Sequence, residues 1–277
     1  MHILGVYSKI IACVDGSYDS EVAAKYAMGL AHESGATLIF LHVKTEKDVD
    51  ASASIGRLER IAARRGIQTD IEYRKGDQFD QIRKAVRKTG ADVVVASSGG
   101  KVKEHGILSG NLAYDLIQGL DVTVFVIKSV RGTTAKEHNK ILCPIQSVTP
   151  SLSERAYALD MLSRLYKSPI SLLRCYRIQE DRYLTKEEQA SIFDKMRNYV
   201  SPLTEELSER GVRTYLFTRI CYSIKGSVLD FLERNKYDLL FLRVTPGRFF
   251  RFTRKDFAIE VMKSSECNVI LWKPRAQ

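Results

Sequence analysis

Two glycine-containing loops carry the side chains that are best suited to holding a small anion or a nucleotide. The first is segment 14–17, Val-Asp-Gly-Ser, in which Asp15 can accept hydrogen bonds from a ribose or a base. The second is segment 97–111, which contains several glycines and ends where a helix is predicted to begin. Backbone amides of such a loop, together with the positive end of a helix, form an anion site. The alternative is a solvent loop whose glycines only turn the chain.

A third segment, residues 243–255, combines basic and aromatic side chains. Five cations are interleaved there with Phe249, Phe250 and Phe252. Such side chains can grip phosphates and stack on bases, as in sites for single-stranded nucleic acid. We favour the alternative, in which the phenylalanines pack against the rest of the protein and the arginines stay in solvent, so nucleic acid is not an expected partner. The candidate anion-binding residues are Arg243, Arg248 and Arg251.

Residues typical of catalysis or of metal binding are scattered along the chain. The five cysteines include no Cys-x-x-Cys pair, and the five histidines show no metal-ligand spacing. We therefore predict no metal site, and we expect free cysteines in a reducing cytoplasm. His42 lies in a buried strand and His105 in the second glycine loop, but the sequence supplies no geometry for a general base. No catalytic residue is predicted, and an enzymatic role is not favoured.

The elements that must position these loops alternate between short apolar strands and amphipathic helices. The strands are continuously apolar, which is typical of a parallel sheet covered by helices on both faces. In such a sheet, ligands bind beyond the carboxyl ends of the strands where the strand order reverses. The loops after the first, second and fourth strands are therefore the candidate site. In the first half we predict strands at 10–14, 37–43, 69–73, 92–96 and 122–127, and helices at about 22–31, 49–65, 79–88 and 112–118.

The same order of elements repeats in the second half of the chain. Residues 9–11 match residues 140–142, and residues 124–128 match residues 269–273. We therefore expect an α/β protein made of two tandem, five-stranded, Rossmann-like parallel-sheet sandwiches. The predicted domains are residues 1–130 and 138–277, joined by the polar linker 129–139.

The second copy is longer, and we place its extra residues in a longer helix within segment 179–211. Ser151 with Glu154, and Thr185 with Glu188, have the spacing of a capping box. These pairs predict that helices begin near residues 152 and 186.

The net charge of +10 is carried unevenly. Lys and Arg outnumber Asp and Glu by 17 to 16 in residues 1–130 and by 26 to 17 in residues 131–277, which gives +1 and +9. The basic charge suggests an anionic partner for the second half, and it is no evidence for a nucleotide in the first. No apolar run approaches the roughly 18 residues of a membrane helix, so we expect no membrane insertion and a soluble, cytoplasmic protein.

The two copies resemble a tandem member of the universal stress protein (UspA) family. The resemblance rests on segment 14–17 after the first strand and on segment 91–100 at the fourth strand. It implies an adenine nucleotide alpha hydrolase-like fold and a role in stress response or signalling. Family members that bind ATP carry the pattern Gly-x2-Gly-x9-Gly-Ser/Thr between the fourth strand and the last helix.

In this sequence the second and third glycines of that pattern fall on Gly100 and Gly110. Ser97 replaces the first glycine, and Asn111 replaces the hydroxyl residue. The resemblance therefore implies ATP or another adenine nucleotide as ligand, with Mg²⁺ as a companion of ATP. Slow ATP hydrolysis is the least favoured alternative, because we can nominate no base for it.

The resemblance also assigns roles to other residues of the first half. It implies that Val14 and Asp15 meet the adenine and the ribose, and that Val43 lines the base pocket. In the second copy Asp15 is replaced by Gln146 and Ser97 by Arg243, so we predict no ATP site of the family type there.

In the family, the last strands of two domains pair to form dimers. The resemblance thus implies that segments 122–127 and 269–272 pair within this chain, and a homodimer of the whole chain stays open. The alternative function is a nucleotide-independent interaction module, in which the basic, aromatic loop of the second domain binds an anionic partner.

Overall fold

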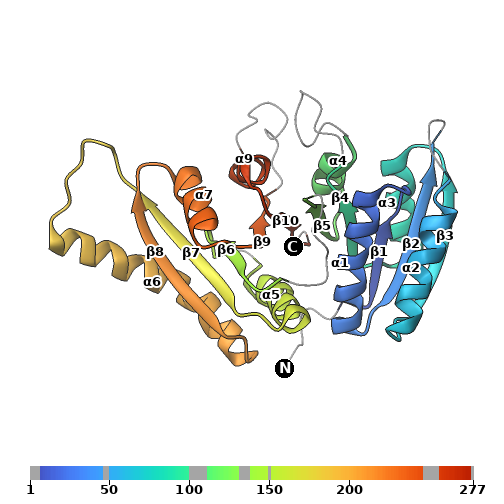
Figure 1. Cartoon of the computed structure of the whole chain (residues 1–277), viewed down its shortest axis with the longest axis horizontal. Coiled ribbons are helices and arrows are strands. Elements are labelled where there is room, and N and C mark those ends of the chain that lie inside the picture. The colour runs from blue at the N-terminus through green and yellow to red at the C-terminus, as the bar shows by residue number, and fades with distance from the viewer. Residues whose placement is uncertain are drawn as a thin grey trace.

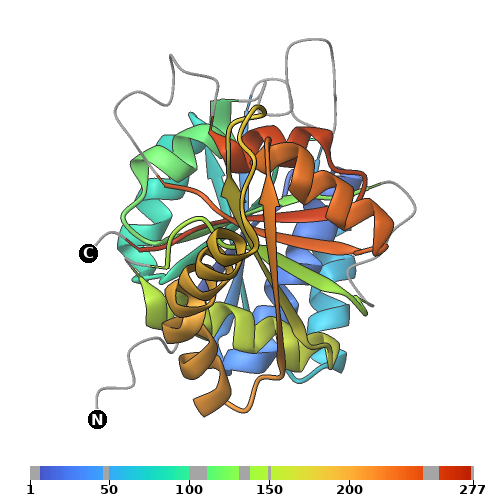
Figure 2. The same cartoon turned by 90° about the vertical axis from the view of Figure 1, so that its left-hand side faces the viewer.

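The computed structural model describes residues 7–45, 50–99, 111–130, 138–148, 151–245 and 256–275. Within these residues the chain forms one sheet of ten strands with helices on both faces (Figure 1). The strand order is β3-β2-β1-β4-β5-β10-β9-β6-β7-β8. Seen from the β8 edge, the strands fan out with the twist that parallel sheets adopt (Figure 2). The predicted α/β fold, a mostly parallel sheet covered by helices, is confirmed, and the two sets of five strands join into one sheet where β5 pairs with β10.

The strands and helices alternate along the whole chain. The strands are β1 (Lys9–Cys13), β2 (Thr37–Lys44), β3 (Thr69–Lys75), β4 (Val93–Ser97), β5 (Thr123–Lys128), β6 (Ile141–Pro144), β7 (Ile170–Arg177), β8 (Thr214–Cys221), β9 (Leu239–Arg243) and β10 (Asn268–Lys273). The helices are α1 (Tyr18–Ser34), α2 (Ser52–Arg64), α3 (Gln78–Thr89), α4 (Asn111–Gly119), α5 (Leu152–Tyr166), α6 (Lys186–Glu209), α7 (Ile224–Arg234) and α9 (Phe257–Ser264). Every element predicted for the first half is present.

Two apolar cores lie on opposite faces of the sheet. Helices α1, α2, α5 and α6 bury their apolar side chains on one face, and α3, α4, α7 and α9 bury theirs on the other. Inner strands such as β4 are buried almost throughout, whereas every residue of the edge strands β3 and β8 is exposed or half-buried. This difference follows from their places in the sheet, because an inner strand is covered on both faces. No helix among the described residues is long and apolar enough to cross a membrane.

The two halves of the sheet repeat the same contacts. The Asp92 carboxylate accepts a hydrogen bond from the backbone N–H of Ser8 at 2.8 Å, just before β1. The Asp238 carboxylate accepts one from the backbone N–H of Asn139 at 2.9 Å, just before β6. The aspartates precede β4 and β9, which are neighbours of β1 and β6 in the sheet. The repeat detected in the sequence therefore extends to individual hydrogen bonds.

The two halves meet through β5 and β10, which are antiparallel neighbours with Val269 opposite Lys128 and Lys273 opposite Val124. Lys128 donates through Nζ to the carbonyl oxygen of Met262 at 2.8 Å, near the end of α9. Lys273 donates to the carbonyl oxygen of Val122 at 3.0 Å, just after α4. Each lysine thus ends a strand of one half and contacts the last turn of the last helix of the other half or the segment just after it.

The two predicted capping boxes differ in outcome. Thr185 accepts a hydrogen bond from the backbone N–H of Glu188 and Glu188 accepts one from that of Thr185, so this box is confirmed at the start of the long helix α6. Helix α5 begins after Ser151 as predicted, but the box itself is wrong. Ser151 has a φ of 69° and its side chain accepts no capping bond. The Glu154 carboxylate instead accepts hydrogen bonds from the Thr123 hydroxyl and from the backbone N–H of Arg275. It is therefore not available to cap the start of α5.

Candidate functional site

A small cavity lies at the carboxyl ends of β1, β2 and β4. The first residues of α3 and α4 lie beside it. Its volume is about 70 Å³. Among its lining residues are Val14, Asp15, Val43 and Ser97, which come from three separate strand ends. The structure therefore brings together four of the seven residues predicted for nucleotide binding. Gly100 and Gly110 lie outside the described residues, and Asn111 is the first residue of α4.

The position of the cavity follows from the topology. Strand β1 lies between β2 and β4, so the chain leaves β1 at the point where the strand order reverses. The backbone N–H of Val14 donates to the carbonyl oxygen of Leu41 at 2.9 Å, which holds the loop after β1 against β2. The buried His42 ring is hydrogen-bonded through Nδ1 to the carbonyl oxygen of Val14 at 2.8 Å. These two bonds fix the apolar side of the cavity.

Asp15 supplies the one carboxylate among the described lining residues. Its Oδ1 accepts a hydrogen bond from the backbone N–H of Ser17 at 2.9 Å, and its own N–H donates to the Ser20 hydroxyl at 3.3 Å. Partial burial of the carboxyl, the strongest influence, raises its pKa, but the hydrogen bonds from Ser17 and Ser20 outweigh it. The pKa of Asp15 therefore lies below its ordinary value, and the group is an ionised acceptor at neutral pH.

Cys13 also lines the cavity, where it acts as a small apolar side chain. Burial, and then the neighbouring Asp15 carboxylate, raise the pKa of its thiol to about 12. A thiol with this pKa is almost wholly protonated at neutral pH and is a poor nucleophile. All five cysteines of the chain are free.

Several lining residues are absent from the sequence-based prediction. Gln78 and Ile82 belong to α3, Leu112 belongs to α4, and Ser20 belongs to α1. The sequence predicts these helices, but it does not give the angles at which they pack over the strand ends. A cavity of about 70 Å³ is smaller than the roughly 300–1,000 Å³ of typical ligand pockets. The described residues can thus enclose only one part of a nucleotide.

A second small cavity, of about 40 Å³, lies at the corresponding place in the second half. It is found at the carboxyl ends of β6 and β9, and Arg243 and Arg155 line it. Arg243 was predicted from the sequence as an anion-binding residue, whereas Arg155 was not. Arg248 and Arg251 lie outside the described residues.

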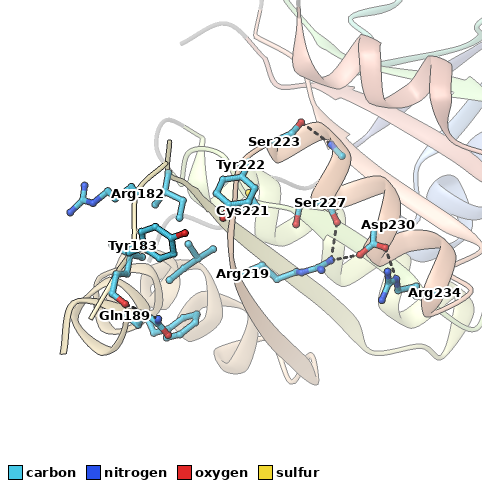
Figure 3. A pocket seen from close by; sticks show the side chains of 15 residues that line it. Arg182, Tyr183, Gln189, Arg219, Cys221, Tyr222, Ser223, Ser227, Asp230 and Arg234 are labelled. Atoms are coloured by element: carbon cyan, nitrogen blue, oxygen red, sulfur yellow. Dashed lines mark hydrogen bonds and ion pairs between the residues drawn. The ribbon is translucent and has the colours of Figure 1, made fainter. Parts of the chain in front are cut away.

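The largest cavity described, about 800 Å³, lies beside the edge strand β8 and contains no residue predicted for a site (Figure 3). Its walls come from the end of β8, from α7 and from the segment between β7 and α6. Arg219 forms an ion pair with Asp230 at 2.9 Å, and Arg234 contacts the same carboxylate. Arg219 and Arg234 share this carboxylate, and Arg182 pairs with Glu188 at 3.4 Å, so each arginine among the described lining residues has a carboxylate partner. No cluster of metal ligands occurs in the part of the chain that the structure describes.

Comparison with known proteins gives consistent results. Residues 7–128 match the model of the universal stress protein family. Universal stress protein MJ0531 of Methanocaldococcus jannaschii is 26% identical over 146 residues, which cover 44% of this chain and 83% of that protein.

Two solved structures resemble nearly the whole chain. One is protein PA1789 of Pseudomonas aeruginosa PAO1, described as functionally unknown, with a TM-score of 0.69 at 14% identity. The matched region covers 97% of this chain and 93% of the PA1789 chain. A universal stress protein from Archaeoglobus fulgidus DSM 4304 has a TM-score of 0.62 at 14% identity and covers 97% of both chains. At this level of identity the two structures show that the fold is shared.

Proposed function

We propose that the first half of the chain, whose residues 7–128 match the model of the universal stress protein family, binds an adenine nucleotide, ATP or a close relative. The observation that supports this most is the cavity at the ends of β1, β2 and β4. Val14, Asp15, Val43 and Ser97 line it together, although they come from three segments that are far apart in the sequence. These are the described positions at which the family resemblance implies contacts with the base, the ribose and the phosphates.

Each side chain has a role that its chemistry supports. Val14 and Val43 offer apolar surface to the base, and the ionised Asp15 accepts hydrogen bonds from ribose hydroxyl groups. Ser97 lies at the end of β4, where its hydroxyl can donate to a phosphate oxygen. In this proposal Gly100, Gly110 and Asn111 complete the phosphate site, and Mg²⁺ enters with ATP.

We further propose two domains, residues 1–130 and 138–277, that pair within one chain. The β5–β10 ladder supports this arrangement, since it covers two strand edges that would otherwise be exposed. A homodimer is then not needed to cover these edges. In this proposal the protein acts in the cytoplasm in stress response or signalling, by binding nucleotide rather than by turning it over, because we identify no general base for hydrolysis.

Equilibrium binding of radiolabelled ATP to the full chain tests the nucleotide proposal. Replacing Asp15 with asparagine keeps the size of the side chain and its acceptor oxygen but removes the charge. Hydrogen bonds to a charged group contribute about 1.5–3 kcal/mol, so Asp15→Asn should weaken ATP binding by about 10- to 100-fold. Gln146→Asn, at the corresponding position of the second half, is the matched control and should bind ATP like the unaltered protein. Equal ATP affinities for all three proteins would contradict the proposed site.

A further inference from the structure

Two arginines of the second half are enclosed without a carboxylate partner. Arg155, in α5, is 2% exposed, and Arg243, at the end of β9, is half-buried. Arg155 donates through Nη1 to the carbonyl oxygen of Ser147 at 2.6 Å, and Arg243 donates through Nη1 to the Ser147 hydroxyl at 2.8 Å. A guanidinium has five N–H donors, and in both residues the Nε group is buried with no hydrogen-bond partner. Among the described residues, these arginines therefore lack the acceptors that buried cations normally have.

Other arginines of this half show what the usual arrangement is. Arg219 pairs with Asp230 at 2.9 Å, and Arg210 pairs with Glu206 at 2.8 Å. Burying a charge is costly unless it is paired with an opposite charge and fully hydrogen-bonded. Among the described residues, Arg155 has the Ser147 carbonyl oxygen and the face of the Trp272 ring, 5.9 Å away, as partners, but no carboxylate.

The charge state of the pair sharpens this point. Burial, the strongest influence, and repulsion from the nearby Arg243 guanidinium together lower the pKa of Arg155 to about 10. Burial also lowers the pKa of Arg243. Arginine with a pKa of about 10 is still protonated at neutral pH. Two neighbouring positive charges are therefore held together with only neutral acceptors around them in the described structure.

Arg155 and Arg243 line the same cavity, and its size limits what can occupy it. It measures about 40 Å³, and its walls include Gln146, Ser147 and Thr245. One water molecule needs roughly 10–15 Å³ of such space, so about three waters fit, which is close to the size of a tetrahedral oxyanion. The described walls of this cavity enclose less space than those of the cavity in the first half. The neighbouring strands β6 and β9 diverge at this point because the strand order reverses there.

We propose that the second half binds an inorganic tetrahedral oxyanion, of which phosphate is the type, between Arg155 and Arg243. The anion supplies the negative charge and the acceptor oxygens that the described residues do not provide. Planar guanidinium groups bind phosphate oxygens through paired hydrogen bonds. Anion binding at this site does not depend on nucleotide binding in the first half. It would also give part of the +9 charge of the second half a specific role, which is to bind an anion.

Thermal unfolding and calorimetric titration of the full chain with inorganic phosphate test this site. Phosphate is compared with chloride at matched ionic strength, so that general screening by salt is the same in both arms. A ligand that binds the folded state raises Tm progressively with its concentration. We expect such a rise with phosphate, and we expect Arg243→Gln to weaken phosphate binding at least tenfold. Arg197→Gln, in which the lost arginine pairs with Asp194 at the surface, is the control and should leave the phosphate response unchanged.

A second variant separates lost binding from lost folding. Arg155→Met replaces a buried, unpaired cation with an apolar side chain, a change that is often neutral or stabilising. We expect this variant, without phosphate, to have a Tm equal to or above that of the unaltered protein, and to gain nothing from phosphate. If Arg155→Met does not fold, Arg243→Gln decides the question. A Tm that responds equally to phosphate and chloride, or a phosphate response that persists in Arg243→Gln, would overturn the site.

Discussion

Lys273 lies at the junction of the two halves of the sheet, and replacing it with methionine tests what holds them together. Its side chain is 3% exposed, and its Nζ donates to the carbonyl oxygens of Leu120 and Val122 across the β5–β10 junction. Burial lowers the pKa of Lys273, because the ammonium group is removed from water. The hydrogen bonds to the two carbonyl groups must outweigh this cost if the contact is to stabilise the pairing.

The size of the effect follows from these opposing contributions. Hydrogen bonds to a charged group contribute about 1.5–3 kcal/mol each, and the methionine variant loses two of them. Relief of the desolvation cost offsets part of that loss. We therefore expect Lys273→Met to lower the free energy of unfolding by about 2 kcal/mol, which for a chain of this length corresponds to a fall in Tm of roughly 4 °C. Lys128→Met, which removes the same kind of contact in the opposite direction, should show a similar loss.

Urea unfolding monitored by circular dichroism, together with calorimetry, measures this difference. Lys263→Met is the matched control, since Lys263 is an exposed lysine on α9 and should change stability by less than about 0.5 kcal/mol. If Lys273→Met is as stable as Lys263→Met, the lysine contacts do not hold the two halves together and the reasoning is refuted.

Three further substitutions probe the first half of the chain. Burial raises the pKa of Glu72, but hydrogen bonds from Lys88 and Arg74 outweigh burial. The pKa of Glu72 therefore lies below its ordinary value. The stabilisation is therefore present above the unfolded-state pKa of about 4.3 and is lost as pH falls through the folded-state value. Glu72→Gln should cost about 1 kcal/mol at pH 7 and progressively less as the pH falls below about 4.3, and a deficit independent of pH in urea unfolding would count against this. Gly29→Val should cost about 1–3 kcal/mol by the same measurement, because a Cβ at Gly29 would lie 2.4 Å from Leu165 Cδ2. Gly56→Ala, with nothing within 4 Å of the added methyl, should stabilise α2, and an equal loss at both glycines would contradict the packing argument.

The fold could be predicted from the sequence because its strands are continuously apolar and its order of elements repeats. Strand β4, for example, is a run of buried residues that pairs with β1 on one side and β5 on the other. The start of α5 was predicted for the wrong reason. Ser151 and Glu154 have capping-box spacing, but Glu154 is engaged by Thr123 of β5, a contact between the halves that local spacing does not reveal.

The candidate site could be predicted where it depends on strand ends. Asp15 and Ser97 follow parallel strands, so they must lie at the same edge of the sheet. Helix packing could not be predicted in this way. Arg155 and Arg164 lie in the same helix, yet Arg155 is buried while nearly half of the Arg164 side chain is exposed. The sequence alone gives no reason to distinguish them, because the difference arises from the strands on which α5 packs.

Native mass spectrometry of the full chain with ATP tests the central claim most directly, because it counts the nucleotides bound to each chain. We predict one ATP per chain for the unaltered protein and a markedly reduced bound fraction for Asp15→Asn at the same ATP concentration. No bound ATP at millimolar concentration would contradict nucleotide binding by the first half. Two bound ATP molecules would contradict the assignment of the smaller, arginine-lined cavity to an inorganic anion.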